Sequence, residues 1–171
     1  MDNSRQKLLL RLYAVARELG CDFNAFLTDQ DERIKFQKKI YAAQRSGFSF
    51  GYNYNLYVHG PYCSSLADDG YEIARDLAAY RDCGYSFSEK GQEKISKAKQ
   101  FYNENDEVDW LETITTLDYL CKLQRNRGIN DPVTLKRETL AAFGKIKPLL
   151  SANTDMMEAA WTSIEKFGRA S

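Results

Sequence analysis

The sequence is short of the residues that build metal sites and membrane spans. His59 is the only histidine, and no Cys-x-x-Cys pair occurs, so the local ligand spacing of a zinc site is missing. No window approaches the ~20 apolar residues that cross a bilayer. Charges interrupt the N-terminal leucines where a signal peptide has an uninterrupted apolar core. We therefore expect a cytoplasmic protein with no membrane association, no metal and no cofactor.

The chain also lacks a net charge of either sign. Its 24 basic and 24 acidic residues cancel, which removes the long-range positive field typical of proteins that bind nucleic acids. Its cysteines are far apart and predict reduced, mostly buried thiols; they are Cys21, Cys63, Cys83 and Cys121. The 43% hydrophobic and 28% charged residues over 171 positions are typical of one ordered domain, or of a small domain with a helical extension.

Helical periodicity covers most of the chain. The predicted helices share apolar residues at three-to-four-residue spacing, and they cover 4–19, 28–47, 64–84 and 89–101, with three more after Asp109, after Pro132 and around 156–168. Asp29 or Thr28 is the predicted cap of the second helix, and Ser64 or Ser65 that of the third. Ser88 is the predicted cap of the fourth.

Between the second and third helices the hydrophobic period changes to two. Aromatic and aliphatic residues alternate with small polar ones from Phe48 to His59, which predicts a half-buried strand. Because Pro61 cannot donate a ladder hydrogen bond, the strand should stop at Gly60 and Pro61. A short strand is also predicted at 85–87, which gives the order helix, helix, strand, helix, strand, helix of a winged helix.

The predicted fold class is therefore mainly α with a small β component. A winged-helix-like domain is expected over 1–103, and a helical extension packed on it over 104–171. The polar segment at 103–109 marks the boundary between them.

Two segments resemble a set of largely uncharacterised bacterial, archaeal and phage winged-helix-like proteins. These proteins carry a Lys-x-Gln-Lys-x-x-Tyr helix, which here comprises Lys35, Gln37, Lys38 and Tyr41. Their Tyr-x-x-Gly-Pro-Tyr-Ser junction is present at 57–62, with Cys63 in place of the serine and His59 where an aromatic residue is common. YSFSEKG at 85–91 and LAAFGKIKP at 140–148 resemble further segments of the set. The chain is also distantly similar to SocA-like antitoxin domains of prophage and toxin systems, which implies a regulator with a partner protein.

The Gly-Pro-Tyr junction is the candidate binding site. Gly60 permits an unusual backbone angle, Pro61 fixes its own backbone angle, and Tyr62 anchors the following helix. The alternative interpretation is purely structural, because a corner of the chain needs the same three properties. The candidate partner-binding residues are Tyr54, Tyr57, His59, Gly60, Pro61 and Tyr62. Hydrolase or transferase chemistry by His59 and Cys63 is a third interpretation, but the junction leaves their separation undetermined, so no catalytic residue is assigned.

Nucleic-acid binding is the alternative function. The third helix, which would enter the major groove, is rich in carboxylates, namely Asp68, Asp69, Glu72, Asp76 and Asp82, and these would be repelled by phosphates. The second helix carries the candidate phosphate-binding residues, which are Arg33, Lys35, Lys38, Lys39 and Arg45. A structural interpretation of the same residues is a solvated face that pairs with the acidic segment 104–112.

The sequence therefore favours a non-enzymatic regulator or adaptor that binds a partner protein, in a prophage, toxin–antitoxin or defence context. The alternative is a DNA-binding transcriptional regulator of a mobile element that uses the basic second helix. Acidic and basic segments of this kind also suit a homodimer interface.

Overall fold

The computed structural model describes residues 3–82 and 84–169, and it is mainly helical with one small sheet, as the sequence predicts. Its elements are α1 (Asn3–Glu18), α2 (Gln30–Arg45), β1 (Asn55–Tyr57), β2 (Gly60–Tyr62), α3 (Ser64–Arg75), α4 (Leu77–Arg81), α5 (Glu89–Phe101), α6 (Val108–Asn126), α7 (Pro132–Ile146), α8 (Pro148–Ser151) and α9 (Thr154–Arg169). Within the described ranges, no helix is both long enough and apolar enough to cross a membrane.

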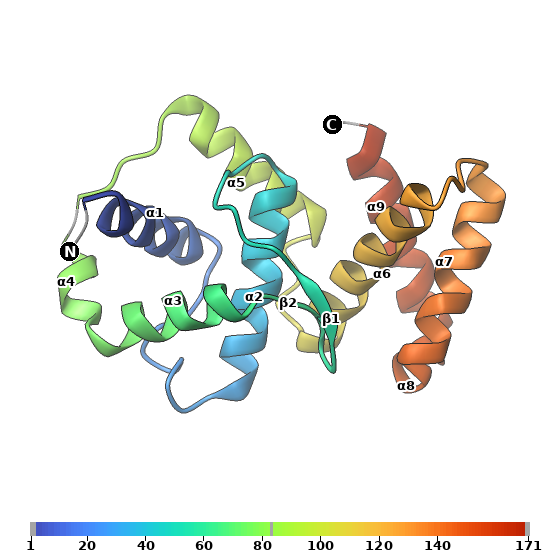
Figure 1. The fold of residues 1–171 in the computed structure, drawn as a ribbon, viewed down its shortest axis with the longest axis horizontal. Coiled ribbons are helices and arrows are strands. Elements are labelled where there is room, and N and C mark those ends of the chain that lie inside the picture. The colour runs from blue at the N-terminus through green and yellow to red at the C-terminus, as the bar shows by residue number, and fades with distance from the viewer. Residues whose placement is uncertain (1–2, 83, 170–171) are drawn as a thin grey trace.

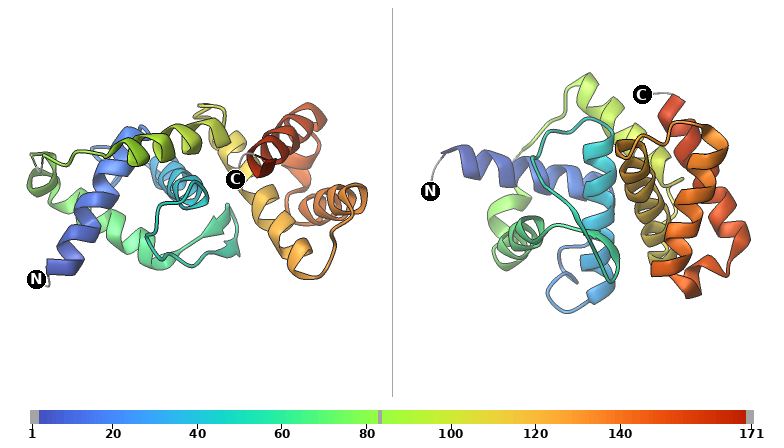
Figure 2. Two further views of the ribbon diagram at one scale, coloured as in Figure 1. Left: turned by 90° about the horizontal axis from the view of Figure 1, so that it is seen from above. Right: turned by 45° about the vertical axis from the view of Figure 1, so that its right-hand side comes forward.

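Helix α2 occupies the centre of the molecule. Helices α1, α3 and α5 pack against it from the first half of the chain, and α6 packs against it from the second half (Figure 1). Helices α7 and α9 pack on α6, and two further views show the same grouping (Figure 2). Because neighbours surround α2, every residue from 36 to 43 is buried.

One continuous apolar core joins the two halves of the chain. It runs from Leu9 in α1 to Phe167 in α9. Near its centre the rings of Phe23, Phe26 and Phe36 lie with their centroids 5.3 to 5.6 Å apart. The exposed loop 103–107 links the halves, and the predicted division into domains at this loop stays a prediction.

Two of the predicted helix caps are confirmed and one is wrong. The Asp29 carboxylate accepts a hydrogen bond from the Asp31 amide, and the Ser88 hydroxyl accepts one from the Gly91 amide. Helix α3 instead begins at Ser64, with Cys63 as a cap that makes no side-chain hydrogen bond to the helix. Ser64 and Ser65 both lie inside the helix, so neither is the cap. The third helix also breaks at Asp76, which separates α3 from α4.

The two-residue hydrophobic period correctly predicts the buried face from Phe48 to Tyr52, but it is wrong at Val58, which is 79% exposed, and it does not give the hydrogen-bonding partner. Phe48, Phe50 and Tyr52 are buried while the residues between them are exposed. Only Asn55–Tyr57 of this segment pairs as a strand, and it ends before Gly60, in agreement with the predicted stop. The prediction missed that Gly60–Tyr62 forms a second strand, which is its antiparallel partner. Pro61 is tolerated because a two-stranded sheet consists of edges, where a missing N–H need not face a partner.

Side chains of α2 replace the neighbouring strand along this segment. The Gln44 side chain donates to the Tyr52 carbonyl at 3.0 Å and accepts from the Tyr52 amide at 2.9 Å. Two helical turns earlier, Gln37 donates to the Cys63 carbonyl at 2.9 Å and accepts from the Cys63 amide at 3.1 Å. These amide pairs satisfy backbone groups that a sheet would otherwise bond. They also fix the hairpin against α2 at both of its ends.

The strand predicted at 85–87 is wrong. These residues lie in a segment without ladder hydrogen bonds, and both strands of the described chain belong to the hairpin that precedes α3. The aromatic residues are held by ring contacts instead, with Tyr85 and Phe87 at 5.0 Å and Phe87 and Phe48 at 6.4 Å between centroids. At 85–87 the alternating aromatic residues therefore anchor the segment to the core by ring contacts and do not form a strand.

Candidate functional site

The hairpin divides the predicted partner-binding residues into a surface group and an interior group. Tyr57 and Val58 are 61% and 79% exposed at its tip, and His59 is exposed beside them. The Tyr57 and Tyr62 rings lie 5.2 Å apart and cover one face. The remaining residues, Tyr54, Gly60 and Pro61, contribute to packing, since Gly60 and Pro61 are buried and Tyr54 packs edge-on against Tyr41 at 5.1 Å.

Gly60 brings the hairpin backbone directly onto α6. Its φ of +82° lies in the left-handed region, and a Cβ atom there would stand 2.1 Å from the Thr116 hydroxyl oxygen. On the α2 side, the Lys38 ammonium donates a 2.7 Å hydrogen bond to the Pro61 carbonyl. The hairpin is therefore clamped between two helices from different halves of the chain.

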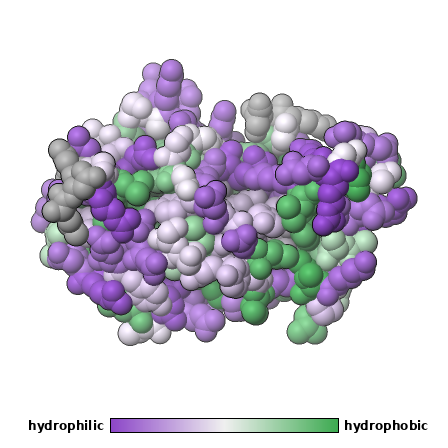
Figure 3. Space-filling model, in the orientation of Figure 1, coloured by the Kyte–Doolittle hydropathy of each residue, from purple (hydrophilic) through white to green (hydrophobic). Residues whose placement is uncertain are grey.

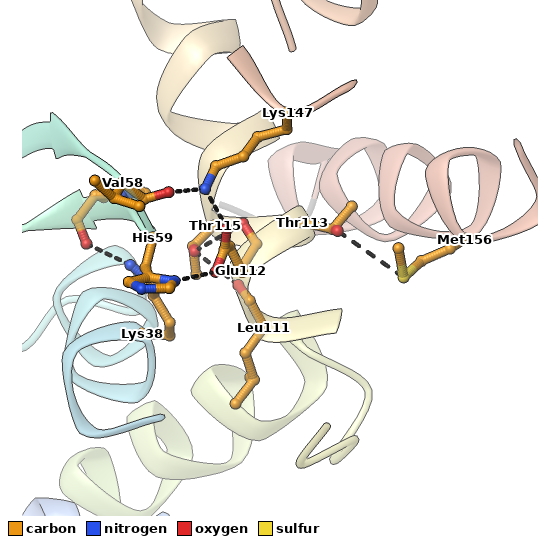
Figure 4. A network of polar contacts seen from close by, with 10 residues as sticks. Lys38, Val58, His59, Leu111, Glu112, Thr113, Thr115, Lys147 and Met156 are labelled. Atoms are coloured by element: carbon orange, nitrogen blue, oxygen red, sulfur yellow. Dashed lines mark hydrogen bonds and ion pairs between the residues drawn. The ribbon is translucent and has the colours of Figure 1, made fainter. Parts of the chain in front are cut away.

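A buried carboxylate ties the hairpin tip to the second half. Glu112 of α6 accepts from Nδ1 of His59 at 3.0 Å and from the ammonium of Lys147, which lies between α7 and α8. The Lys147 ammonium also donates to the Val58 carbonyl. Figure 4 shows His59 and Lys147 approaching Glu112 from different elements. These bonds fix the His59 ring and the tip backbone in one arrangement.

An apolar pocket of about 290 Å³ opens beside the hairpin tip. Its walls come from the 26–38 region, the hairpin and α3, and it is lined by Phe26, Gln30, Arg33, Ile34, Phe36, Gln37, Lys38, Tyr57, Val58, His59, Tyr62, Ala67 and Tyr71. Small-molecule and peptide sites are commonly apolar concavities of this type with a few convergent polar groups. Three surface residues of the predicted site, Tyr57, His59 and Tyr62, therefore meet at one pocket.

Lys38 is the unusual polar group of this pocket. It is 1% exposed, and its ammonium donates a hydrogen bond to the Pro61 carbonyl. Among residues 3–82 and 84–169 it forms no ion pair with a carboxylate. Burial lowers the pKa of Lys38 to about 7, opposed by the negative charge of Glu112 and reinforced by the positive charge of Lys147. The side chain is a desolvated amine that is readily stabilised by a nearby anion.

The predicted basic surface of α2 is wrong for most of its residues. Lys38 and Lys39 are buried, and Lys39 donates to the Gly20 carbonyl and pairs with Asp106. Lys35 pairs with Glu32 at 2.9 Å and with Asp106 at 3.3 Å, so the pairing of these lysines with the acidic segment 104–112 is confirmed. The central position of α2 explains the error, because a helix with neighbours on all sides buries its lysines with its apolar residues.

The two arginines predicted for the same surface are also engaged. Arg45 forms a two-point bond with the buried Asp118, through Nε at 2.8 Å and Nη2 at 3.0 Å. Arg33 donates to the Phe26 carbonyl at 2.9 Å while it lines the pocket. Among the residues that the structure describes, the basic side chains of α2 therefore do not form a continuous basic face.

The negative charge of α3 is also smaller than the sequence suggests. Asp69 is buried, where it accepts from Arg5 at 2.7 Å and from the Tyr52 hydroxyl at 2.5 Å. Glu72 pairs with Arg5 as well, at 2.7 Å. The other three predicted carboxylates, Asp68, Asp76 and Asp82, are exposed. Arg5, which the sequence did not mark, therefore neutralises part of this helix.

Cys63 and His59 do not form a nucleophile–base pair. The Cys63 thiol is buried with Ser65 as its partner at 3.2 Å, whereas His59 is held by Glu112. Cys21 and Cys121 are likewise free thiols, and Cys83 lies outside the described residues. Within 3–82 and 84–169 no three His, Cys, Asp or Glu side chains gather into a group that could hold a metal ion.

Sequence reasoning missed the residues that hold the site in place. Glu112 and Thr116 lie four positions apart on α6, and both are buried. A polar pair at this spacing within a long helix with mostly buried residues is a usable signal, since such groups need partners. Lys147 is harder to identify from the sequence, because only its position in the LAAFGKIKP segment distinguishes it from other lysines.

Comparison with known proteins finds no matching family model, no matching curated protein and no matching solved structure. The resemblance to winged-helix-like proteins and to SocA-like domains therefore stays a prediction.

Proposed function

We propose that this protein is a non-enzymatic regulator or adaptor that binds a partner protein at the hairpin tip and the adjacent pocket. The observation that carries the proposal is an exposed apolar patch on a rigid support. The patch consists of Tyr57 and Val58 at the tip, with Ile146 and Leu149 at the α7–α8 corner. Lys147 joins the two parts of the patch through its bond to the Val58 carbonyl.

The patch has the properties of a protein-binding surface. Leu149 is 90% exposed and Val58 is 79% exposed, so neither apolar side chain contributes much burial free energy in the free chain. A bound partner would bury both. Figure 3 shows apolar residues gathered over the hairpin tip and α8 on one face of the molecule. Tyr57 adds an exposed aromatic side chain to the patch, and tyrosines are enriched among the residues that dominate binding energy.

The proposal predicts that Val58→Asp abolishes partner binding while Val133→Asp does not. Val133 is a matched control, since it is 75% exposed and lies at the opposite end of α7 from Lys147. A partner is first captured from native extract with the tagged chain, identified by mass spectrometry and purified. Its Kd is then measured for each variant, and we expect at least a tenfold increase for Val58→Asp.

Melting temperatures of the two variants provide the stability control. Both should melt within a few degrees of the parent chain, because both changes are at exposed side chains. Equal affinity of the parent and the Val58→Asp variant would exclude the hairpin tip as the interface. A chain that stays monomeric and captures nothing would remove the proposal itself.

The DNA-binding alternative has no comparable support, because the lysines that it needs are buried or paired. The proposal retains a cytoplasmic, winged-helix-like regulator in a prophage, toxin–antitoxin or defence context as its setting. Each of these attributes, and a homodimer, stays a prediction.

A further inference from the structure

The pocket beside the hairpin is lined by basic side chains without acidic ones among the described residues. Three basic side chains line it, from Arg33, Lys38 and His59, and none of the residues described around it is acidic. The chain as a whole has equal numbers of acidic and basic residues, so this local excess is a property of the site. The rest of the lining is mainly aromatic and aliphatic. An anion with an apolar body fits both features.

Lys38 gives the anion a specific place to bind. A buried ammonium is costly unless an opposite charge pairs with it, and the described residues supply Lys38 with a carbonyl but no carboxylate partner. Glu112, whose negative charge acts on Lys38, is already bonded to His59 and Lys147. A carboxylate that enters the pocket would complete the environment of Lys38 with a charge-assisted hydrogen bond.

We propose that this pocket binds the C-terminal residue of the partner protein, with its apolar side chain against the aromatic wall and its carboxylate on Lys38. The inference rests on the proposed function and names the chemistry of the partner. About 290 Å³ lies just below the usual size range of pockets for drug-sized ligands, so it accommodates roughly one large residue. A chain end combines an apolar side chain and a carboxylate in a single residue, and it needs only one opening.

The exposed hairpin tip supports the same geometry. Tyr57 and Val58 both line the pocket and extend into solvent, so the residues that precede the terminus would lie across them. Capture of a terminal carboxylate by donor groups is a recurring mode of peptide recognition.

The test uses the parent chain and acetylated tetrapeptides that end in leucine, isoleucine, methionine or phenylalanine, each as a free acid and as a C-terminal amide. Binding is followed by the methyl NMR signals of Ile34 and Ala67, which line the pocket. We expect at least one free acid to shift both signals and its amide to bind about tenfold or more weakly. Equal binding of acid and amide, or no binding of any peptide at millimolar concentration, overturns the proposal.

Two further arms identify the source of the carboxylate and the group that binds it. If 3-phenylpropanoate binds while every peptide acid is rejected, the pocket takes a small acid and the assignment to a chain end is wrong. Lys38→Met should abolish the preference for acid over amide, whereas Lys97→Met, the same change at an exposed position of α5 outside the pocket lining, should retain it. Should the Lys38 variant fail to fold, the comparison of acid with amide on the parent chain still decides.

Proton uptake provides an independent readout. In the free protein, Lys38 is mostly neutral at pH 8, because its pKa is lowered to about 7. A bound carboxylate favours the charged form, so binding at pH 8 should take up about one proton, and binding at pH 5.5 should take up almost none at Lys38. Calorimetry in two buffers with different ionisation enthalpies measures this number. The uptake should vanish in Lys38→Met and persist in Lys97→Met, and a parent chain that binds without proton uptake at pH 8 contradicts the role of Lys38.

Failure of this inference is distinguishable from failure of the proposed function. If Val58→Asp abolishes partner binding but acid and amide peptides bind equally, the proposed interface is supported and the proposed recognition of a terminal carboxylate is wrong. If acid peptides bind more tightly than amides but Val58→Asp leaves the Kd of the partner unchanged, the pocket assignment is supported and the partner binds at another surface.

Discussion

Replacing Asp118 by asparagine is expected to lower the free energy of unfolding by about 3 kcal/mol, the low end for breaking a buried ion pair. The carboxylate is 2% exposed and accepts from Arg45 at two points, from the Tyr41 hydroxyl at 2.6 Å and from Lys122 at 3.2 Å. These bonds join α2 to α6, so an amide there leaves Arg45 without its charge partner. Arg45 is partly solvated, which keeps the loss near 3 kcal/mol.

The same substitution should remove a pH dependence. Burial by itself raises the pKa of Asp118, but the hydrogen bond from Arg45 and the charges of Lys122 and Arg45 outweigh it, so the pKa lies below its usual value. A lowered folded-state pKa means that the contribution is fully present above the unfolded pKa of about 4 and is lost as the pH falls below it. The difference in stability between the parent chain and Asp118→Asn should therefore shrink between pH 6 and pH 3.

Asp109→Asn is the matched control, since the same change is made on the same helix at an exposed position. Urea unfolding of the three proteins at several pH values measures both effects, and Asp109→Asn should stay within about 0.5 kcal/mol of the parent chain. A constant difference for Asp118→Asn across that pH range would show that its carboxylate does not titrate with folding.

The second large effect is expected for Gly60→Ala, which should cost about 2 to 5 kcal/mol. A residue with a side chain loses roughly 1 to 2 kcal/mol in the left-handed region, and overpacking costs about 1 to 3 kcal/mol more. The overpacking arises because the added methyl group meets the Thr116 hydroxyl at 2.1 Å. The hairpin would have to move away from α6, which would also weaken the His59 and Lys147 bonds to Glu112.

Gly51→Ala separates the two contributions. Gly51 has nearly the same φ, +80°, but a Cβ there would meet nothing within 4 Å, so only the backbone cost should be measured. Adding Thr116→Ala to Gly60→Ala should recover part of the overpacking cost, because the Thr116 hydroxyl is buried with no hydrogen-bond partner of its own. Equal losses for Gly51→Ala and Gly60→Ala in urea unfolding would show that the contact with α6 is unimportant.

The helices were largely predictable from the sequence, because caps and periodicity are local signals. Asp29 and Ser88 marked helix starts correctly, since a short polar side chain satisfies free amides wherever it occurs. The hairpin was not predictable, because alternation shows which face is buried and not which segment pairs. The amide clamps from Gln37 and Gln44 remove the need for a partner strand, and neither glutamine differs in sequence from a surface residue.

The candidate site was predictable only at its surface. The junction residues Tyr57, His59 and Tyr62 do meet at one pocket, whereas Lys38 was assigned to the wrong environment. The periodicity of α2 correctly predicts its apolar stripe at Phe36, Ile40 and Ala43. It does not show that other helices cover the remaining faces. Burial of lysine is set by the tertiary neighbours of a helix, which a single helix pattern does not contain.

The hydrogen bonds that hold the hairpin tip determine when this surface forms during folding. The bond from Lys147 to Val58 spans 89 positions of sequence, and that from His59 to Glu112 spans 53. Contacts so distant along the chain form late, after their loop-closure entropy has been overcome. A nascent chain on the ribosome has to release α6 and α7 before the tip is held in place, so recognition at the hairpin would report that synthesis has passed Lys147.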